Sequence, residues 1–369
     1  MTTTFGIEEE TMLVDPASLL PVACEPVFGA VRADPETGPF VSREYLASQI
    51  EFSSPVYTRL PEAFDGISRF REVVAAACSE SGLVAWNGGT PFATPDGPPD
   101  VTPSPRYEGI ARGFGAVVDD HQINALHVHV GVPSRAEGVR AMNAMRPWLP
   151  VLLALGGNSP FWRGRDTGFA SWRSILMSRW TTNGCPPSFE GPEDYDTRLA
   201  RLVGVGGTAD AATVAWNLRL SESLPTVEFR VFDAQLEAWQ SVLLAAICRA
   251  LVLTALGDAS PPVAVDPELL DAAAWHAARD GLTGLLVHPV SGSLASADEV
   301  VAELRRRIGP ALQESGDAAS VDELLHRLLR EGGGATLQRA AHAEGGREAL
   351  GRIGSRRWPI RAGRAIFRG

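Results

Sequence analysis

The chain has 369 residues, of which 45% are hydrophobic, and a formal net charge of −11 at pH 7. Its length allows one large domain or two or three ordinary ones, with enough apolar content for a sizeable core. The negative charge disfavours nucleic acid as a partner, and because all 33 basic residues are arginine, a lysine-dependent phosphate-binding loop is excluded.

The cysteines and the N-terminal segment point to a reducing compartment. The four cysteines are scattered without CxxC spacing, which argues against a zinc ribbon and against a disulfide scaffold. The opening "MTTTFGIEEE" has no basic region followed by an apolar one. No stretch approaches the roughly 18 apolar residues that would cross a bilayer. We therefore expect a cytoplasmic protein with no membrane contact.

Short apolar runs between Gly/Pro turns predict strands in the first two thirds of the chain, with helices between them. The predicted strands are Thr4–Val14, Gln49–Ser53, Leu83–Trp86, Leu126–Val132 and Thr226–Phe232. The predicted helices are Pro61–Ser81, Glu137–Leu155, which Pro147 and Pro150 should kink or end, and Ala238–Leu256, which is apolar nearly all round and should be buried.

The last hundred residues are predicted to be helical. Asp266-Pro267-Glu268 has the form of an N-cap, a first-turn proline and a first-turn acid, and "EGGGA" at 331–335 interrupts the helical pattern. Six arginines lie between residues 352 and 368, where a solvated helix is favoured over contact with a nucleotide. Strands without strict βαβ alternation predict an α+β fold with a mostly antiparallel sheet. We expect a catalytic α+β region at 1–260 and a helical C-terminal region at 261–369 on the same domain.

Acids and histidines occupy positions in four of these strands where an apolar residue would be less costly. Residues two apart on a strand share a face, so Glu8 and Glu10 point one way and Glu9 the other. The same rule pairs two histidines on one strand and an acid with an arginine on another. With Glu44, which lies seven residues before Glu51 and outside the predicted strands, the full set is Glu8, Glu10, Glu44, Glu51, His127, His129, Glu228 and Arg230.

If these strands share a sheet, one face carries several carboxylates that repel one another unless cations lie between them. Oxygen-rich ligation suits Mg²⁺ or Mn²⁺ better than zinc. Each acid alone is more often part of a solvated outer face, and the pattern leaves that alternative open. Two or three divalent ions with an arginine form a clamp for a transferring phosphoryl group. "GVGGTA" at 204–209 follows a helical segment, so we interpret it as a turn and not as a dinucleotide loop.

Several blocks resemble a known family in the expected order. They are "FGIEEETMLVD", "ASQIEFSSPV", "NGGTPF", "ALHVHVGVP", "NSPFWRGRDTGFASWRS" and "TVEFRVFDAQ". The chain resembles the glutamate–cysteine ligase family, in its bacterial carboxylate–amine ligase (type 2) branch, from about residue 5 to 240. The resemblance implies a glutamine-synthetase-like fold, in which a curved antiparallel sheet forms an active-site funnel flanked by helices. It also implies ATP-dependent amide synthesis.

The resemblance further implies roles for individual residues. Arg230 would contact the transferring phosphate and Arg173 would hold the carboxylate substrate. The acids with His127 would hold Mg²⁺ around the ATP phosphates; these ligands are Glu8, Glu10, Glu44, Glu51, His127 and Glu228, of which Glu51 is also counted as catalytic with Arg230. His129 is expected to bind nucleotide, with a polar core position as the alternative. Arg165 and Trp172 are expected at the anionic substrate, with arginine–aromatic stacking on a surface loop as the alternative.

The leading hypothesis is an ATP- and Mg²⁺-dependent carboxylate–amine ligase working through an acyl phosphate. The product would be γ-glutamylcysteine or a related γ-glutamyl amide. Its partners would be small-molecule carboxylate and amine substrates, and a homo-oligomer is compatible with the sequence. Two alternatives stay open: a metal-dependent hydrolase using the same acids, and a non-catalytic nucleotide- or amino-acid-binding homologue.

Overall fold

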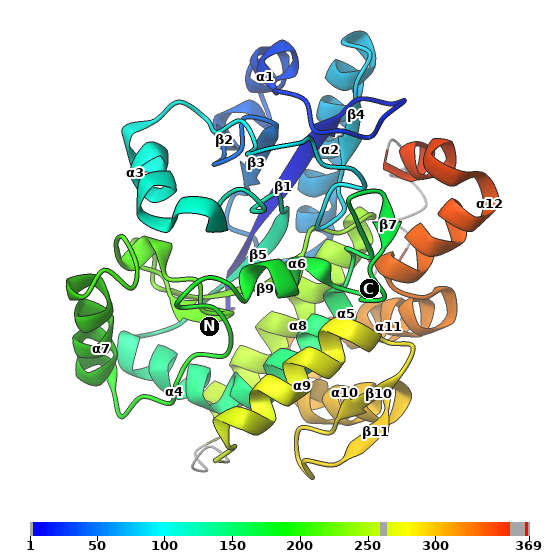
Figure 1. Ribbon diagram of the computed structural model, residues 1–369. Helices are drawn as coiled ribbons and strands as arrows, with labels where there is room; N and C mark the ends of the chain where they lie inside the picture. Colours follow the sequence, from blue (N-terminus) through cyan, green and yellow to red (C-terminus); the bar gives the residue numbers. More distant parts are fainter. Residues whose placement is uncertain (1–2, 259–263, 355–365, 368–369) are drawn as a thin grey trace.

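The computed structural model describes residues 3–258, 264–354 and 366–367. The arginines of the C-terminal cluster, apart from Arg352, lie outside the described residues. One seven-stranded sheet forms the centre of the molecule, in the order β2-β3-β1-β5-β9-β8, with β4 also paired to β1 (Figure 1). Every pairing in it is antiparallel. Its strands are β1 (Phe5–Val14), β2 (Val41–Arg43), β3 (Gln49–Ser53), β4 (Val84–Trp86), β5 (Ala125–Gly131), β8 (Leu218–Leu220) and β9 (Thr226–Asp233).

All five predicted strands are confirmed to within one residue at each end. The short strands β2 and β8 were not predicted, because three residues carry too little alternation to be detected. Two small hairpins lie outside the main sheet. They are β6 (Phe161–Trp162) with β7 (Arg165–Asp166), and β10 (Leu285–Val287) with β11 (Leu294–Ser296), the second of which interrupts the region predicted to be helical.

The helices confirm the effect of the prolines. The predicted Glu137–Leu155 helix is two helices, α4 (Arg135–Met145) and α5 (Leu149–Gly156), with Pro150 in the first turn of α5, where a missing N–H costs nothing. The segment at 204–209 follows a helix end and forms turns, as interpreted. The other helices are α1 (Glu25–Arg32), α2 (Leu60–Glu80), α3 (Pro105–Phe114), α6 (Trp172–Met177), α7 (Pro192–Gly204), α8 (Ala238–Gly257), α9 (Pro267–Asp280), α10 (Ala297–Ser315), α11 (Ala318–Glu331) and α12 (Gly334–Gly354).

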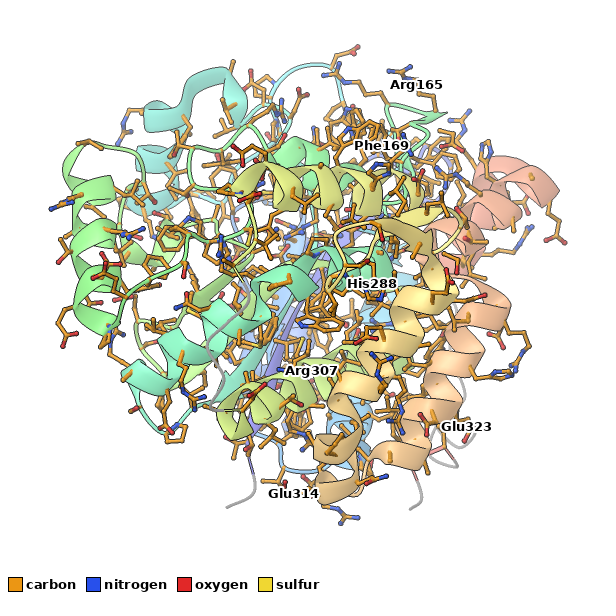
Figure 2. The ribbon with its side chains drawn as sticks, turned by 90° about the horizontal axis from the view of Figure 1, so that it is seen from below. Arg165, Phe169, His288, Arg307, Glu314 and Glu323 are labelled. Atoms are coloured by element: carbon orange, nitrogen blue, oxygen red, sulfur yellow. The ribbon has the colours of Figure 1, made fainter. Side chains whose placement is uncertain are left out.

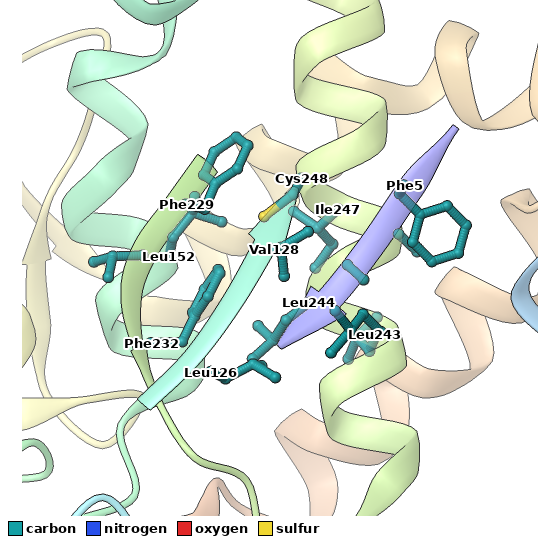
Figure 3. Close-up of a cluster of buried hydrophobic side chains, with 14 of the residues drawn as sticks. Phe5, Leu126, Val128, Leu152, Phe229, Phe232, Leu243, Leu244, Ile247 and Cys248 are labelled. Atoms are coloured by element: carbon teal, nitrogen blue, oxygen red, sulfur yellow. The ribbon is translucent and has the colours of Figure 1, made fainter. Parts of the chain in front are cut away.

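Helix α8 packs on the back of the sheet and forms the centre of the core (Figure 3). Leu243, Leu244 and Ile247 from this helix meet Val128 of β5 and Phe229 of β9, all buried. One sequence expectation needs correction here, because by length and composition α8 could cross a bilayer. Since 78% of its most apolar window is buried inside the protein, the same composition is explained by packing on all sides.

The C-terminal helices continue this layer. Helix α9 packs on α5, and α10 and α11 pack on α8, so the described part of 264–354 shares the core of the sheet region. The division at residue 260 remains a prediction. With helices gathered behind the sheet, its front face is left for polar side chains, and α3 and α6 lie over that face (Figure 1).

Candidate active site

The register of the strands explains how three consecutive glutamates are tolerated in β1. Glu9 points to the helical side, where it is fully buried and both carboxylate oxygens accept from Arg71, at 2.7 Å, while Ser241 donates to one of them at 2.8 Å. Glu8 and Glu10 point to the front face. The charge of Glu9 is therefore neutralised by Arg71 of α2, with a hydrogen bond from Ser241 of α8. Glu8 and Glu10 are on the opposite face of the sheet.

The front face collects the predicted residues from neighbouring strands. Glu10 lies opposite Glu51 of β3, Glu8 lies opposite His127 of β5, and His129 lies opposite Glu228 of β9. Six predicted residues line a cavity of about 330 Å³, namely Glu8, Glu10, Glu44, Glu51, His127 and Arg230, whereas His129 and Glu228 are buried beside it. The front face is therefore a concave, acidic site and not a solvated sheet face.

On the β5–β9–β8 side, each acid has a basic partner. Nδ1 of His127 and Nε2 of His129 each lie 3.2 Å from a Glu8 oxygen, and Glu228 pairs with Arg230 and, at 2.7 Å, with Arg219. Burial alone would raise the pKa of Glu228, but the two arginines outweigh it and hold that pKa well below its usual range. Burial is likewise outweighed at Glu8, where hydrogen bonds from both histidines lower the pKa. We call this set the compensated half; it consists of Glu8, His127, His129, Arg219, Glu228 and Arg230.

On the β3–β1 side, three carboxyl groups face one another without such partners. Burial, then repulsion from Glu51, raises the pKa of Glu10 to about 7, although the Ala125 N–H donates to it at 2.7 Å. Burial and the charges of Glu51 and Glu10 raise the pKa of Glu44 well above its usual value, and burial also raises the pKa of Glu51. We call Glu10, Glu44 and Glu51 the acidic trio. It is a place where a cation would be stabilising.

The donor chemistry fits divalent cations. One ligand atom each from Glu8, His129 and Glu228 lie within 4.8 Å of one another, a carboxylate–imidazole set that suits Mg²⁺ or Mn²⁺. The sequence placed His127 among the metal ligands and His129 at the nucleotide, whereas this group contains His129. His127 donates from Nδ1 to the same Glu8 carboxylate, at 3.2 Å, and its role as a ligand remains a prediction.

Arg173 supplies a positive group at the base of the site. It is the second residue of α6 and is 5% exposed. Its Nη1 lies 4.0 Å from an oxygen of Asp233. Its Nη2 donates to the Arg230 carbonyl at 3.2 Å, and its Nε has no hydrogen-bond partner among the described residues. It lines a small recess with Arg230 and Asn217. A buried guanidinium with a spare donor matches a carboxylate ligand.

Two predicted substrate residues are not brought to the cavity. Arg165 lies in the exposed β6–β7 hairpin and projects from the surface in Figure 2. Trp172 packs on Phe169, with ring centroids 5.4 Å apart, because the start of α6 directs Arg173 inward and its neighbour to the other side. Neither residue lines the described cavity, and the contact of Trp172 is with Phe169 and not with an arginine, so both the substrate role and the arginine–aromatic stacking remain predictions.

The cavity also contains residues that the sequence did not reveal. Arg219 of β8 is one; the alternation "LRL" just before the "TVEFRV" strand is the signal that could have found it. Asp233 also went unnoticed; it lies behind the site beside Arg173, and it accepts hydrogen bonds from Ser159, Ser171 and the Asn158 N–H. Aromatic residues such as Tyr45, Tyr107 and Trp180 also line the cavity. They belong to no short sequence motif, so nothing in the sequence indicated their place in the site.

This fold occurs in solved ligase structures. Glutamate–cysteine ligase of Francisella tularensis in complex with AMP superimposes with a TM-score of 0.72 at 13% identity, covering 100% of this chain and 91% of that one. A bifunctional glutathione synthetase from Pasteurella multocida gives 0.70 at 18% identity, covering 96% of this chain and 52% of that one. The glutamine-synthetase-like α+β fold expected from the resemblance is confirmed.

Sequence relatives define the group more narrowly. The model of glutamate–cysteine ligase family 2 matches residues 4–355. A putative glutamate–cysteine ligase 2-2 of Saccharopolyspora erythraea is 40% identical over 98% of this chain and 94% of its own length. A putative glutamate–cysteine ligase 2 of Streptomyces coelicolor is 39% identical, over 97% of each.

Fold and relatives together define an ATP-dependent ligase. Within that class, the chain belongs to glutamate–cysteine ligase family 2.

Proposed function

We propose that this ligase joins a carboxylic acid to an amine through an acyl phosphate, using ATP and Mg²⁺. The product is γ-glutamylcysteine or a related γ-glutamyl amide. The observation that carries the proposal is the charge order of the cavity, in which the acidic trio lies beside the compensated half and its Arg230, with Arg173 behind. Anionic substrates and cations are needed together to balance such a site.

The reaction requires charge stabilisation and no covalent protein nucleophile. In the first step a carboxylate oxygen of the acid attacks the γ-phosphorus of ATP, the bond to the β-phosphate oxygen breaks, and ADP leaves. In the second step the amine nitrogen attacks the acyl carbon, the bond from that carbon to the phosphate oxygen breaks, and the nitrogen loses a proton. Inorganic phosphate and the amide are the products.

The residues divide this work by position. Divalent cations, when bound, neutralise the phosphate oxygens, and they would be held by Glu8, Glu228, His127 or His129 on one side and by the acidic trio on the other. Arg230, held by Glu228, is oriented to stabilise charge on the transferring phosphoryl group. Arg173 holds the carboxylate beside it, and Glu51 acts through the cation that it helps to bind.

A product screen by mass spectrometry tests this function. The protein is incubated with ATP, Mg²⁺ and pooled amino acids and amines, with reactions lacking ATP or Mg²⁺ as controls. An amide product that appears with ADP and phosphate, and only when both are present, is the expected result. Turnover without ATP would instead support the hydrolase, and tight ATP binding with no turnover would support the non-catalytic homologue.

Location and assembly belong to the same proposal. A cytoplasmic location is supported by the four free cysteines, since none of them is in a disulfide. Small-molecule substrates are supported by the size of the cavity. The expectations about nucleic acid, membranes and a homo-oligomer remain predictions.

A further inference from the structure

One wall of the catalytic cavity is built from aromatic rings. Tyr107 contacts Tyr45 with ring centroids 5.4 Å apart, Tyr45 contacts His121 at 5.7 Å, His121 contacts Trp180 at 4.7 Å, and Trp180 contacts Phe114 at 4.4 Å. All five line the same cavity as the acidic trio. We call this set the aromatic wall. It joins four separate segments of the chain, so its continuity exists only in the folded protein.

The aromatic wall is uncharged. The Trp180 Nε1–H donates to His121 Nδ1 at 3.1 Å, which uses the one donor of the indole. Burial, with Arg173 and Arg179 nearby, lowers the pKa of His121 to about 3, so the imidazole is neutral. Burial raises the pKa of Tyr107 to about 12, so that phenol is neutral as well. The wall therefore adds no charge to the cavity, and Ile110 and Met177 extend its apolar surface.

One part of the wall, Tyr107, lies near the acidic trio, and another, His121, lies near Arg173. The acidic trio lies at β3 and β1, and the charge of Glu44 is felt by Tyr107. Met177 lines both the cavity that contains the wall and the recess that contains Arg173. His121 is close enough to Arg173 for that charge to act on it. The wall thus flanks the place proposed for the carboxylate, from which the amine must attack.

We infer that the acceptor amine carries a flat, apolar side chain and that the aromatic wall binds this side chain. Among such amines, those with an aromatic ring should bind best. This inference rests on the proposed function and narrows its second substrate. Flat apolar groups bind favourably to aromatic rings, because offset and edge-to-face packing contributes binding free energy beyond the burial of apolar area. A cysteine side chain would cover little of this surface, and glycine would cover none of it.

The experiment compares three acceptors with three variants. L-phenylalanine, L-cysteine and glycine are supplied with L-glutamate, ATP and Mg²⁺, and KM is measured for each substrate in turn. The variants are Trp180→Leu and Phe114→Leu in the wall, with Trp275→Leu as the matched control. Trp275 is a tryptophan that is 46% exposed on α9 and packs on Phe169 and Arg279, away from the cavity.

The expected KM for L-phenylalanine in the unaltered protein is at least about tenfold below that for glycine, from the packing of two or more rings. Trp180→Leu raises it on the order of tenfold, and Phe114→Leu raises it severalfold, while KM for ATP stays within about twofold. Trp275→Leu changes neither. Phe114→Leu keeps the inference testable if Trp180→Leu fails to fold.

Three results would overturn the inference. They are a preference for L-cysteine over L-phenylalanine, wall variants that raise KM for ATP alone, which would assign the rings to the nucleotide base, and wall variants that change nothing. If the unaltered protein forms no amide, calorimetric titration of L-phenylalanine with Mg²⁺ and a non-hydrolysable ATP analogue still decides the matter. Binding that is lost in Trp180→Leu would sustain the wall while the proposed function fails, whereas no binding would reject both.

Discussion

Glu10 and Glu228 lie on the same face of the sheet, yet the same substitution is expected to change stability in opposite directions. Glu10→Gln removes a carboxylate whose ionisation is opposed by burial and by Glu51. The new amide oxygen can still accept from the Ala125 N–H that now lies 2.7 Å away. Glu228→Gln instead removes the counter-charge of two arginines, Arg219 and Arg230, at a side chain that is 2% exposed.

The magnitude follows from the pKa of Glu10, which rises from 4.5 to about 7. Because the folded-state pKa is raised, the contribution of this carboxyl group to stability is fully present below pH 4.5 and is lost as the pH rises through about 7. One pKa unit corresponds to about 1.4 kcal/mol, so the loss at pH 8 is at most about 3 kcal/mol. Water in the open cavity reduces that to about 1–3 kcal/mol.

Metal-free Glu10→Gln is therefore expected to melt about 1–4 °C above the unaltered protein at pH 8, and to match it at pH 5, given the entropy of unfolding of a chain this long. Glu228→Gln is expected to lose about 3 kcal/mol at pH 8, the cost of breaking a buried ion pair. Its pKa is lowered in the folded state, so the stabilisation it provides is present above pH 4.5 and is lost only in stronger acid.

Thermal unfolding by differential scanning calorimetry in EDTA, at pH 5 and pH 8, checks both variants. Mg²⁺ should then stabilise the unaltered protein at pH 8 and should stabilise Glu10→Gln less, because one ligand of the trio is gone. The reasoning would be refuted if Glu10→Gln lowered the melting temperature at pH 8, or if the difference between the two proteins were the same at both pH values.

Three further substitutions have expected outcomes. Arg173→Lys should raise KM for the carboxylate at least about tenfold with KM for ATP unchanged, because a lysine cannot replace the planar fork, and steady-state kinetics decides. Arg230→Lys should lower kcat by about 10²–10³ with small changes in KM, and a change in KM alone would assign it to ground-state binding. Arg71→Met should cost about 3–5 kcal/mol, since it leaves Glu9 buried and unpaired, and denaturant unfolding would contradict this by showing no loss.

Local pattern was enough to predict the strands and the facing of their acids. Alternation with period two placed Glu8 and Glu10 on one face and Glu9 on the other, and the register confirms it. Prolines 147 and 150 predicted the break between α4 and α5 for an equally local reason, because a missing N–H and a fixed φ act within one turn.

Alternation failed where the sheet is irregular. Strict alternation would turn Val231 away from Arg230, but the register between β5 and β9 shifts beside Leu126, and Val231 lines the same recess as Arg230 and Arg173. The shift also allows Phe232 to join Phe229 in the core behind the sheet (Figure 3). A bulge depends on the partner strand, which a single strand's sequence does not contain.

The sequence by itself determined which residues carry charge, on which face of each strand, and through the resemblance to which family the chain belongs. Only the tertiary structure decided which of those charges have partners: Glu9 with Arg71, Glu228 with Arg219, and the acidic trio with none of the described basic side chains at hydrogen-bonding distance. It also assembled the aromatic wall and left Arg165 outside the cavity. The reason is that facing is set by the alternation within one strand, whereas charge compensation and cavity walls are set by contacts between different elements, such as Glu9 of β1 with Arg71 of α2.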